Sequence, residues 1–161
     1  MLDLNWFDKN YIKATIKTGI RYQGWGQKNR NFFHSFHEGG VACHYIPKLL
    51  SEKVLSQIYF NVKEEKIVNL DQIDAQYIID CRGRSLNKHD EYIPIINPLN
   101  SAILCEEKHI ISGLNYTDCI ATPHGWCFVI PNHNSTSYGY LFNKNLTNKE
   151  EAQSDFCNRF K

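Results

Sequence analysis

The sequence lacks a long apolar run and an excess of charge. No uninterrupted apolar stretch approaches the ~20 residues that a membrane-spanning helix needs, and no charged-then-apolar leader follows Met1. Its 161 residues include 18 Lys and Arg against 17 Asp and Glu, which gives a formal net charge of +1. We therefore expect a cytoplasmic protein that binds neither membranes nor nucleic acid, because nucleic acid needs a concentrated basic surface.

The sequence also lacks metal and disulfide motifs. Its six cysteines include no Cys-x-x-Cys pair and no His spacing of the structural zinc type. We expect reduced thiols and no metal site. A chain of this length fits one domain and can bury roughly 70% of its unfolded surface. The aromatic content, 13%, favours a dense sheet core or a lined pocket.

The dinucleotide-binding fingerprint Gly-x-Gly-x-x-Gly is missing as well. Gly24 and Gly26 have the first spacing, but Asn29 occupies the third place. No strand-to-helix turn is predicted around them. The sequence therefore shows no phosphate-binding loop for a dinucleotide.

A hairpin with an aromatic wall is predicted at residues 121–140. Apolar side chains occupy both faces of its first strand, so we expect burial on both sides. One face carries Trp126, Phe128 and Ile130, and the other carries Cys127 and Val129. Pro131 ends this strand because it lacks a ladder donor, and a polar turn leads into a second strand at 137–142.

Alternation and caps predict further elements on both sides of this hairpin. Residues 11–25 alternate as a strand with one polar face, which carries Lys17. The patterns that follow predict a helix at 47–56, a small hairpin at 58–68, a buried parallel strand at 77–83, extended runs at 94–105 and 108–121, and a helix from a Thr147/Glu150 capping box to Phe160.

Each notable residue also has a purely structural interpretation. Lys17 alone would be a solvated strand lysine, and His34 an exposed or core histidine. Trp126 and Phe128 alone would be sheet core. The strand end at Asp80 would be ordinary, because many strands end in this way.

The order of residues in the hairpin nevertheless forms a longer pattern. Trp-x-Phe-x-Ile-Pro followed by Ser-x-Gly resembles the signature of flavin-dependent halogenases, the tryptophan halogenase family. The matching residues are Trp126, Phe128, Ile130, Pro131, Ser137 and Gly139. The family usually has a second Trp where Phe128 stands, so tryptophan is not assured as the substrate.

Three other segments carry the same resemblance. Residues 14–21, Ala-Thr-Ile-Lys-Thr-Gly-Ile-Arg, resemble the segment with the family's catalytic lysine, which makes Lys17 the catalytic candidate. His34 and Phe36 match a His-x-Phe element of the substrate pocket. Asp80 and Gly83 match an element beside the flavin in this family.

The resemblance implies a mixed α/β, sheet-rich fold of the p-hydroxybenzoate hydroxylase type. It implies an oxidoreductase that uses reduced FAD from a separate flavin reductase, O2 and a halide ion to chlorinate or brominate an electron-rich aromatic substrate. Lys17 would hold hypohalous acid or become a haloamine. The residues Trp126, Phe128, Pro131, Ser137 and Gly139 would join His34 and Phe36 at the substrate.

The resemblance covers a central part of such an enzyme. We expect residues 1–161 to form one partial domain, the substrate-side sheet plus part of the FAD-binding domain, without the amino-terminal fingerprint and the carboxy-terminal part. Other halogenase segments would then be partners, and the isolated chain would be inactive. Two alternatives stay open: a flavin monooxygenase of the same fold, and a noncatalytic remnant or accessory module.

Overall fold

The computed structural model describes residues 10–37, 40–81, 98–109, 111 and 113–160. The chain divides into two compact units. Met1–Ile58 and Asn97–Lys161 form one, which we call the sheet unit, and Tyr59–Ile96 form the other, which we call the small unit. The fold is mixed α/β with a core that is mostly sheet, which confirms the predicted fold class.

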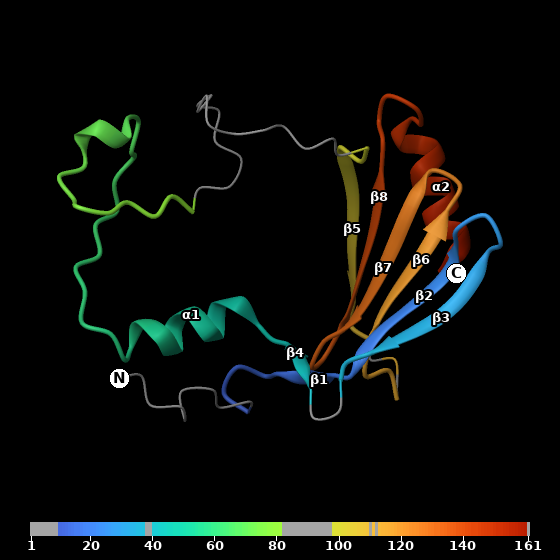
Figure 1. The fold of residues 1–161 in the computed structure, drawn as a ribbon, viewed down its shortest axis with the longest axis horizontal. Coiled ribbons are helices and arrows are strands. Elements are labelled where there is room, and N and C mark those ends of the chain that lie inside the picture. Colours follow the sequence, from blue (N-terminus) through green and yellow to red (C-terminus); the bar gives the residue numbers. More distant parts are fainter. Residues whose placement is uncertain (1–9, 38–39, 82–97, 110, 112, 161) are drawn as a thin grey trace. The chain divides into compact units, whose positions relative to one another are not determined.

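A six-stranded sheet dominates the sheet unit (Figure 1). Its spatial order is β3-β2-β6-β7-β8-β5. The strands are β2 (Gly19–Trp25), β3 (Arg30–Ser35), β5 (Ser101–Glu107), β6 (Thr117–Thr122), β7 (Gly125–Pro131) and β8 (Thr136–Phe142). The pairing of β2 with β6 is parallel and the other pairings are antiparallel, so the sheet joins two antiparallel parts that are distant in sequence.

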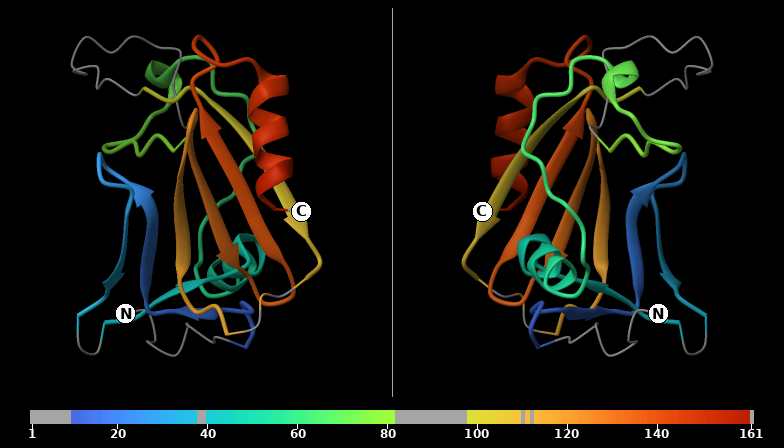
Figure 2. Two further views of the ribbon diagram at one scale, coloured as in Figure 1. Left: turned by 90° about the vertical axis from the view of Figure 1, so that its right-hand side faces the viewer. Right: turned by 90° about the vertical axis from the view of Figure 1, so that its left-hand side faces the viewer.

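One face of this sheet, the helix face, is covered by α2 (Lys149–Arg159), as two further views show (Figure 2). Cys127, Tyr140 and Phe142 form a buried cluster with side chains of the helix. Those helix residues are Ala152 and Phe156, four positions apart on one stripe of the helix. The core therefore lies between α2 and the β7–β8 hairpin.

The opposite face, the aromatic face, carries Trp126, Phe128 and Ile130. All three are half-buried, whereas Cys127 and Val129 on the helix face are buried. The hairpin prediction is confirmed, but burial on both sides is wrong for the described residues. The reason is that α2 covers only the helix face.

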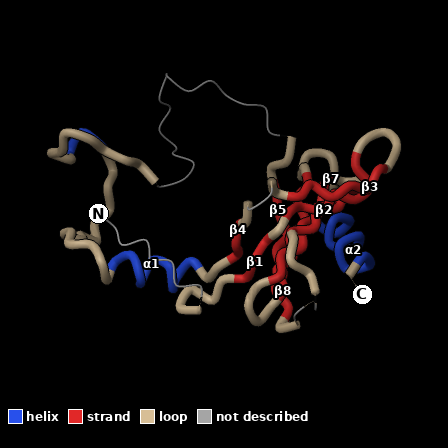
Figure 3. The backbone as a smooth tube through the Cα atoms, turned by 60° about the horizontal axis from the view of Figure 1, so that its bottom comes forward, coloured by secondary structure: helices blue, strands red, loops and turns tan. Residues whose placement is uncertain are grey.

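The predicted strand at residues 11–25 is divided between two sheets. Its first part is β1 (Thr15–Lys17), which pairs with β4 (Ala42–His44) in a separate two-stranded sheet (Figure 3). Thr18 interrupts the run, because its N–H donates to the Asn115 carbonyl and its own carbonyl accepts from the Phe36 N–H. The predicted helix that follows is confirmed as α1 (Pro47–Leu55), with proline in its first turn.

The two elements predicted around the small unit are wrong. The structure has no strand at residues 58–68 or at 77–81. Their apolar side chains are exposed, with Tyr59 at 105% and Ile79 at 89% of full exposure. Alternation does not make a strand where no partner strand pairs with it. The regular element described here is the short 3₁₀ helix η2 (Leu70–Gln72), capped by the Asn69 side chain.

The carboxy-terminal helix begins one residue later than predicted. The cap of α2 is Asn148, whose side chain accepts from the Glu151 N–H at 2.8 Å, so the Thr147/Glu150 capping box is wrong. Thr147 bonds the His124 ring instead, at 3.0 Å. None of the helices described here is long and apolar enough to cross a membrane.

Candidate functional site

The aromatic face is built from residues that lie directly opposite one another on neighbouring strands. Such paired residues point to the same side of a sheet. The row through the centre of this face contains Phe32, Tyr22, Cys119, Phe128, Gly139 and Leu104. Phe32 is 51% exposed and Leu104 is 71% exposed. The described residues thus leave a flat apolar surface partly open.

Phe128 lies directly on Gly139, its cross-strand partner. A Cβ atom at Gly139 would overlap the Phe128 ring. The glycine of the Ser-x-Gly pattern is therefore required for space. Because Gly139 has no side chain, the Phe128 ring can occupy this space against β8.

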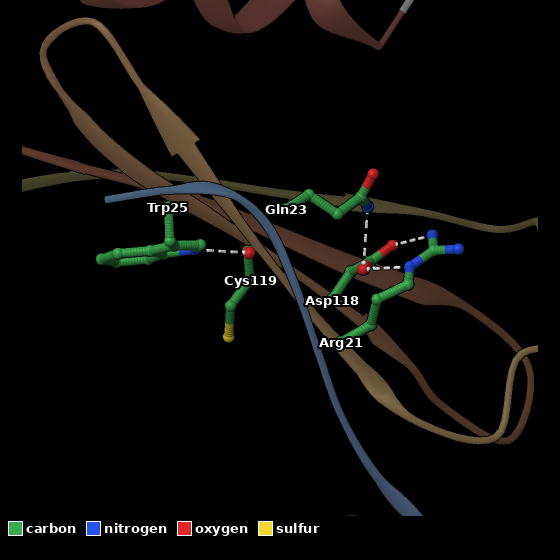
Figure 4. A network of polar contacts seen from close by, with 5 residues as sticks. All are labelled: Arg21, Gln23, Trp25, Asp118 and Cys119. Atoms are coloured by element: carbon green, nitrogen blue, oxygen red, sulfur yellow. Dashed lines mark hydrogen bonds and ion pairs between the residues drawn. The ribbon is translucent and has the colours of Figure 1, made fainter. Parts of the chain in front are cut away.

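Trp126 extends this wall toward β2. Its ring centroid lies 6.1 Å from that of Phe128 and 6.3 Å from that of Trp25. The Trp25 indole N–H donates to the Cys119 carbonyl at 2.8 Å, as the close view shows (Figure 4). A register shift in β2, with Gly24 at a φ of 70°, accompanies this placement of Trp25. The three rings therefore form one continuous aromatic surface.

Lys17 ends β1, and the structure brings it together with two of the other predicted residues. The Lys17 Nζ lies 5.8 Å from the centroid of the Phe36 ring. The His34 and Phe36 rings contact edge to face, with centroids 6.5 Å apart. His34 is exposed at the end of β3, and Lys17 is half-buried. A cation and two rings thus meet at one end of the sheet unit.

His44 belongs to the same group, and sequence reasoning missed it. Its Nδ1 lies 3.2 Å from the Pro131 carbonyl and its Nε2 lies 3.1 Å from Thr117 Oγ1. Burial, together with the charge of Lys17, lowers the pKa of His44 below its ordinary value. His44 stands in a strand of three residues, which is too short to show periodicity. Only the spatial pairing of β4 with β1 brings it to Lys17.

The charge of Lys17 also links this group to the aromatic face. Cys119, in the row that contains Phe128, has a pKa that burial raises and that the Lys17 charge pulls back. The amine is therefore near enough to influence both His44 and the middle of the sheet. Among the predicted residues, Lys17, His34 and Phe36 are in one group, and Trp126, Phe128 and Gly139 lie along the adjoining face.

Pro131 and Ser137 flank the turn of the signature hairpin. The Pro131 carbonyl accepts from Thr15 Oγ1 at 3.1 Å as well as lying against His44. Ser137 Oγ accepts from Asn132 Nδ2 at 2.7 Å, which braces the turn. In this structure Pro131 contacts the lysine-bearing strand pair, while Ser137 serves the hairpin itself.

A buried polar network ties β2 to β6 on the helix face of the sheet (Figure 4). Arg21 pairs with Asp118 through two nitrogens, and Gln23 Nε2 donates to the same carboxylate at 2.9 Å. Asp118 is 5% exposed, so this carboxylate depends on its partners for stabilisation. Its hydrogen bond to Arg21 raises the pKa of the Arg21 guanidinium. The network anchors the β2–β3 hairpin to the rest of the sheet.

The predicted cofactor residues are Asp80 and Gly83. Asp80 is exposed in a segment without regular structure in the small unit, and Gly83 lies outside the described residues. A side chain at Gly19, Gly125 or Gly139 would overlap neighbouring atoms, whereas Gly26 and Gly113 face open space. The described residues contain no cluster of His, Cys, Asp or Glu that could hold a metal ion.

The arrangement can place a cationic amine near an apolar surface of aromatic rings. An ammonium group donates up to three hydrogen bonds, so it can hold an anion or a polar oxidant. A planar aromatic molecule would stack on rings such as Trp126 and Phe128. Together these groups suit a reaction between a polar reagent and an aromatic ring.

The fold resembles those of several halogenases of known structure. The chain resembles the tryptophan halogenase of Shewanella frigidimarina with a TM-score of 0.70 and 16% identity, over 97% of this chain and 46% of that one. A tryptophan 6-halogenase of Streptomyces toxytricini gives 0.64 and 18%, over 91% and 47%. A flavin-dependent halogenase of Brevundimonas sp. gives 0.63 and 12%, over 96% and 48%. The chain thus spans less than half the length of each.

No curated protein matches the chain. The sequence pattern of the family described as "Tryptophan halogenase" matches residues 61–161. This match covers more than half of the chain and includes the signature hairpin from Gly125 to Phe142. The chain therefore belongs to the tryptophan halogenase family.

Proposed function

We propose that this chain forms the substrate side of a flavin-dependent halogenase that acts on an electron-rich aromatic ring in the cytoplasm. The observation that carries the proposal is the half-buried pair of Trp126 and Phe128 on a face where the charge of Lys17 acts on Cys119, the cross-strand partner of Phe128. Reduced FAD from a separate reductase, O2 and a halide ion would be the reagents of the intact enzyme. Residues 1–161 would be one partial domain of it, and the described residues act on the substrate side.

Lys17 would hold hypohalous acid. Its ammonium group can donate hydrogen bonds to the oxygen of the acid, which draws electron density from the halogen and makes it more electrophilic. Attack by a ring carbon forms the carbon–halogen bond and breaks the oxygen–halogen bond. The ring proton and the hydroxide combine as water, so the ring C–H and hypohalous acid give the halogenated ring and water.

The rings would orient the substrate for this attack. Trp126 and Phe128 offer two rings, tilted to each other, on either of which a planar substrate can stack, and Phe36 and His34 border the side nearest Lys17. Holding the substrate ring and the reagent in a reactive orientation raises the reaction rate, because binding has already brought the two together. Phe128 offers a smaller ring than Trp, which favours a substrate with a different outline from tryptophan.

The test is a bromination assay of the intact halogenase that contains this chain, with reduced FAD, bromide and an indole or a phenol. Lys17→Ala should lower bromination by at least about 100-fold, the effect of losing one hydrogen-bond donor at a reacting oxygen, and leave substrate binding unchanged. Lys53→Ala is the matched control, because Lys53 also lies over an aromatic ring, that of Tyr11, at 5.3 Å. Bromination retained in Lys17→Ala would refute the proposal, and a hydroxylated product without bromide would favour a monooxygenase.

A further inference from the structure

The Pro131 carbonyl at the end of β7 is a shared acceptor for the lysine-bearing strand pair. Thr15 Oγ1 donates to it from β1 at 3.1 Å, and His44 Nδ1 lies 3.2 Å from it on β4. Thr15 and His44 are directly opposite each other in the β1–β4 register. One carbonyl of the signature strand therefore contacts both strands of the small sheet at the same level.

The partners of His44 determine which nitrogen carries its proton. A carbonyl oxygen can only accept, so Nδ1 must be the protonated nitrogen facing Pro131. Nε2 is then an acceptor, and the Thr117 hydroxyl, 3.1 Å away, donates a hydrogen bond to it. A neutral His44 thus makes both bonds at once and links β4 to β7 and to β6.

We propose that neutral His44 is a positioning residue for Lys17, which fastens the β1–β4 pair to the end of β7 and the start of β6. Lys17 is the last residue of β1, two positions after Thr15, so the fastening sets where its amine lies beside Phe36 and the aromatic face. The catalytic meaning of this role rests on the function proposed above for Lys17. The two hydrogen bonds of His44 that hold the β1–β4 pair do not depend on that function.

Protonation of His44 would weaken the fastening. The imidazolium can still donate from Nδ1 to the Pro131 carbonyl and from Nε2 to the Thr117 hydroxyl, which can rotate to accept. Its positive charge would nevertheless be half-buried and would face Lys17 on β1, the charged group that acts on His44. Because the pKa of His44 is lowered, this electrostatic cost is absent above about pH 6.5 and appears as the pH falls through the folded-state pKa.

Hydrogen exchange of the 161-residue chain measures the fastening directly. We expect His44→Leu to speed exchange of the β1 and β4 amides by at least about tenfold and to leave the β7–β8 amides unchanged. His44→Gln should restore most of the protection, because its side-chain amide can donate to Pro131 and accept from Thr117. His37→Leu is the control, since His37 is exposed and precedes β4. If His44→Leu fails to fold, Thr117→Val removes one of the two bonds and should give a smaller effect in the same amides.

Two further measurements distinguish a positioning role of His44 from a general contribution to folding stability. In wild type, the protection of the β1 and β4 amides relative to that in His44→Gln should decrease as the pH is lowered from about 6.5. The NMR signals of the Lys17 methylene groups, shifted by the Phe36 ring, should move toward those of exposed lysines in His44→Leu and not in His44→Gln. Equal exchange in all variants, or acceleration that includes β7–β8 equally, would overturn the proposal. None of these readouts uses halogenation, so they stand or fall separately from the Lys17→Ala assay.

Discussion

Gly139 and Phe128 illustrate how a short sequence pattern can encode packing. The two residues are paired across β7 and β8, and the ring occupies the volume that a side chain at Gly139 would need. Gly139 is therefore selected for the space it leaves. The height and tilt of Phe128, and with them the surface offered to a substrate, depend on a residue in the neighbouring strand.

Gly139→Ala tests this packing. We expect it to destabilise the chain by about 1–3 kcal/mol, the usual cost of inserting a methyl group into filled space. Urea unfolding followed by circular dichroism measures the loss. The double variant Gly139→Ala with Phe128→Leu should recover part of it, because the smaller side chain makes room. Equal losses in the single and double variants would contradict the packing role.

At the level of single residues, the sequence predicted part of the site. Only the family resemblance linked Lys17, His34 and Phe36 in the sequence, and the structure places their side chains together. His44 could not be predicted, because its role comes from strands that pair across a long separation in sequence. Asp80 was predicted to lie at the end of a buried strand, and the described residues 77–81 form no strand.

At the level of elements, the contact of α2 with the β7–β8 hairpin holds two ionisable groups in the core. Burial raises the pKa of the Cys127 thiol to about 12 and that of the Tyr140 hydroxyl to about 12. Tyr140 donates to Asp155 of α2 at 2.9 Å, so this hydroxyl also ties the helix to the sheet. The packing of the helix therefore requires both groups to stay protonated.

This requirement predicts a loss of stability in alkali. Both folded-state pKa values lie above the ordinary values of 9.0 and 10.0, so the stabilisation is complete below about pH 9 and is lost as the pH rises toward 12. Cys127→Ala should make the fall between pH 8 and pH 10.5 shallower, and Cys105→Ala, at an exposed position, should not. Urea unfolding midpoints across this range give the slopes. Parallel slopes in Cys127→Ala and wild type would count against the argument.

Elements were predicted best where a neighbour confirms their pattern. The signature hairpin and α2 have apolar residues that pack against each other, whereas α1 has no buried residue and follows the local signal of a proline in its first turn. The run at residues 77–81 has an apolar composition but exposed side chains, and composition does not reveal whether a partner covers them. The break at Thr18 depends on Asn115, a contact across 97 residues that no local pattern contains.

At the level of the whole molecule, the chain spans less than half the length of the halogenases that it resembles and lacks the Gly-x-Gly-x-x-Gly fingerprint. We therefore expect the 161-residue chain to bind FAD weakly, with a dissociation constant above the micromolar range. Titration followed by flavin fluorescence measures this constant, with heat-unfolded chain as the control. A sub-micromolar constant for the folded chain would show that a flavin site exists in it.

The parallel pairing of β2 with β6 has a consequence for how the molecule folds. The strands β6 to β8 and the β2–β3 hairpin can each form from contacts that are near in sequence, whereas Arg21 and Asp118 are 97 residues apart. Closing a loop of that length costs about 4 kcal/mol of chain entropy. We expect β2 and β3 to dock late, as distant contacts generally form slowly. The segment that carries Lys17 would then join last, so the chain completes its candidate site in the final step of folding.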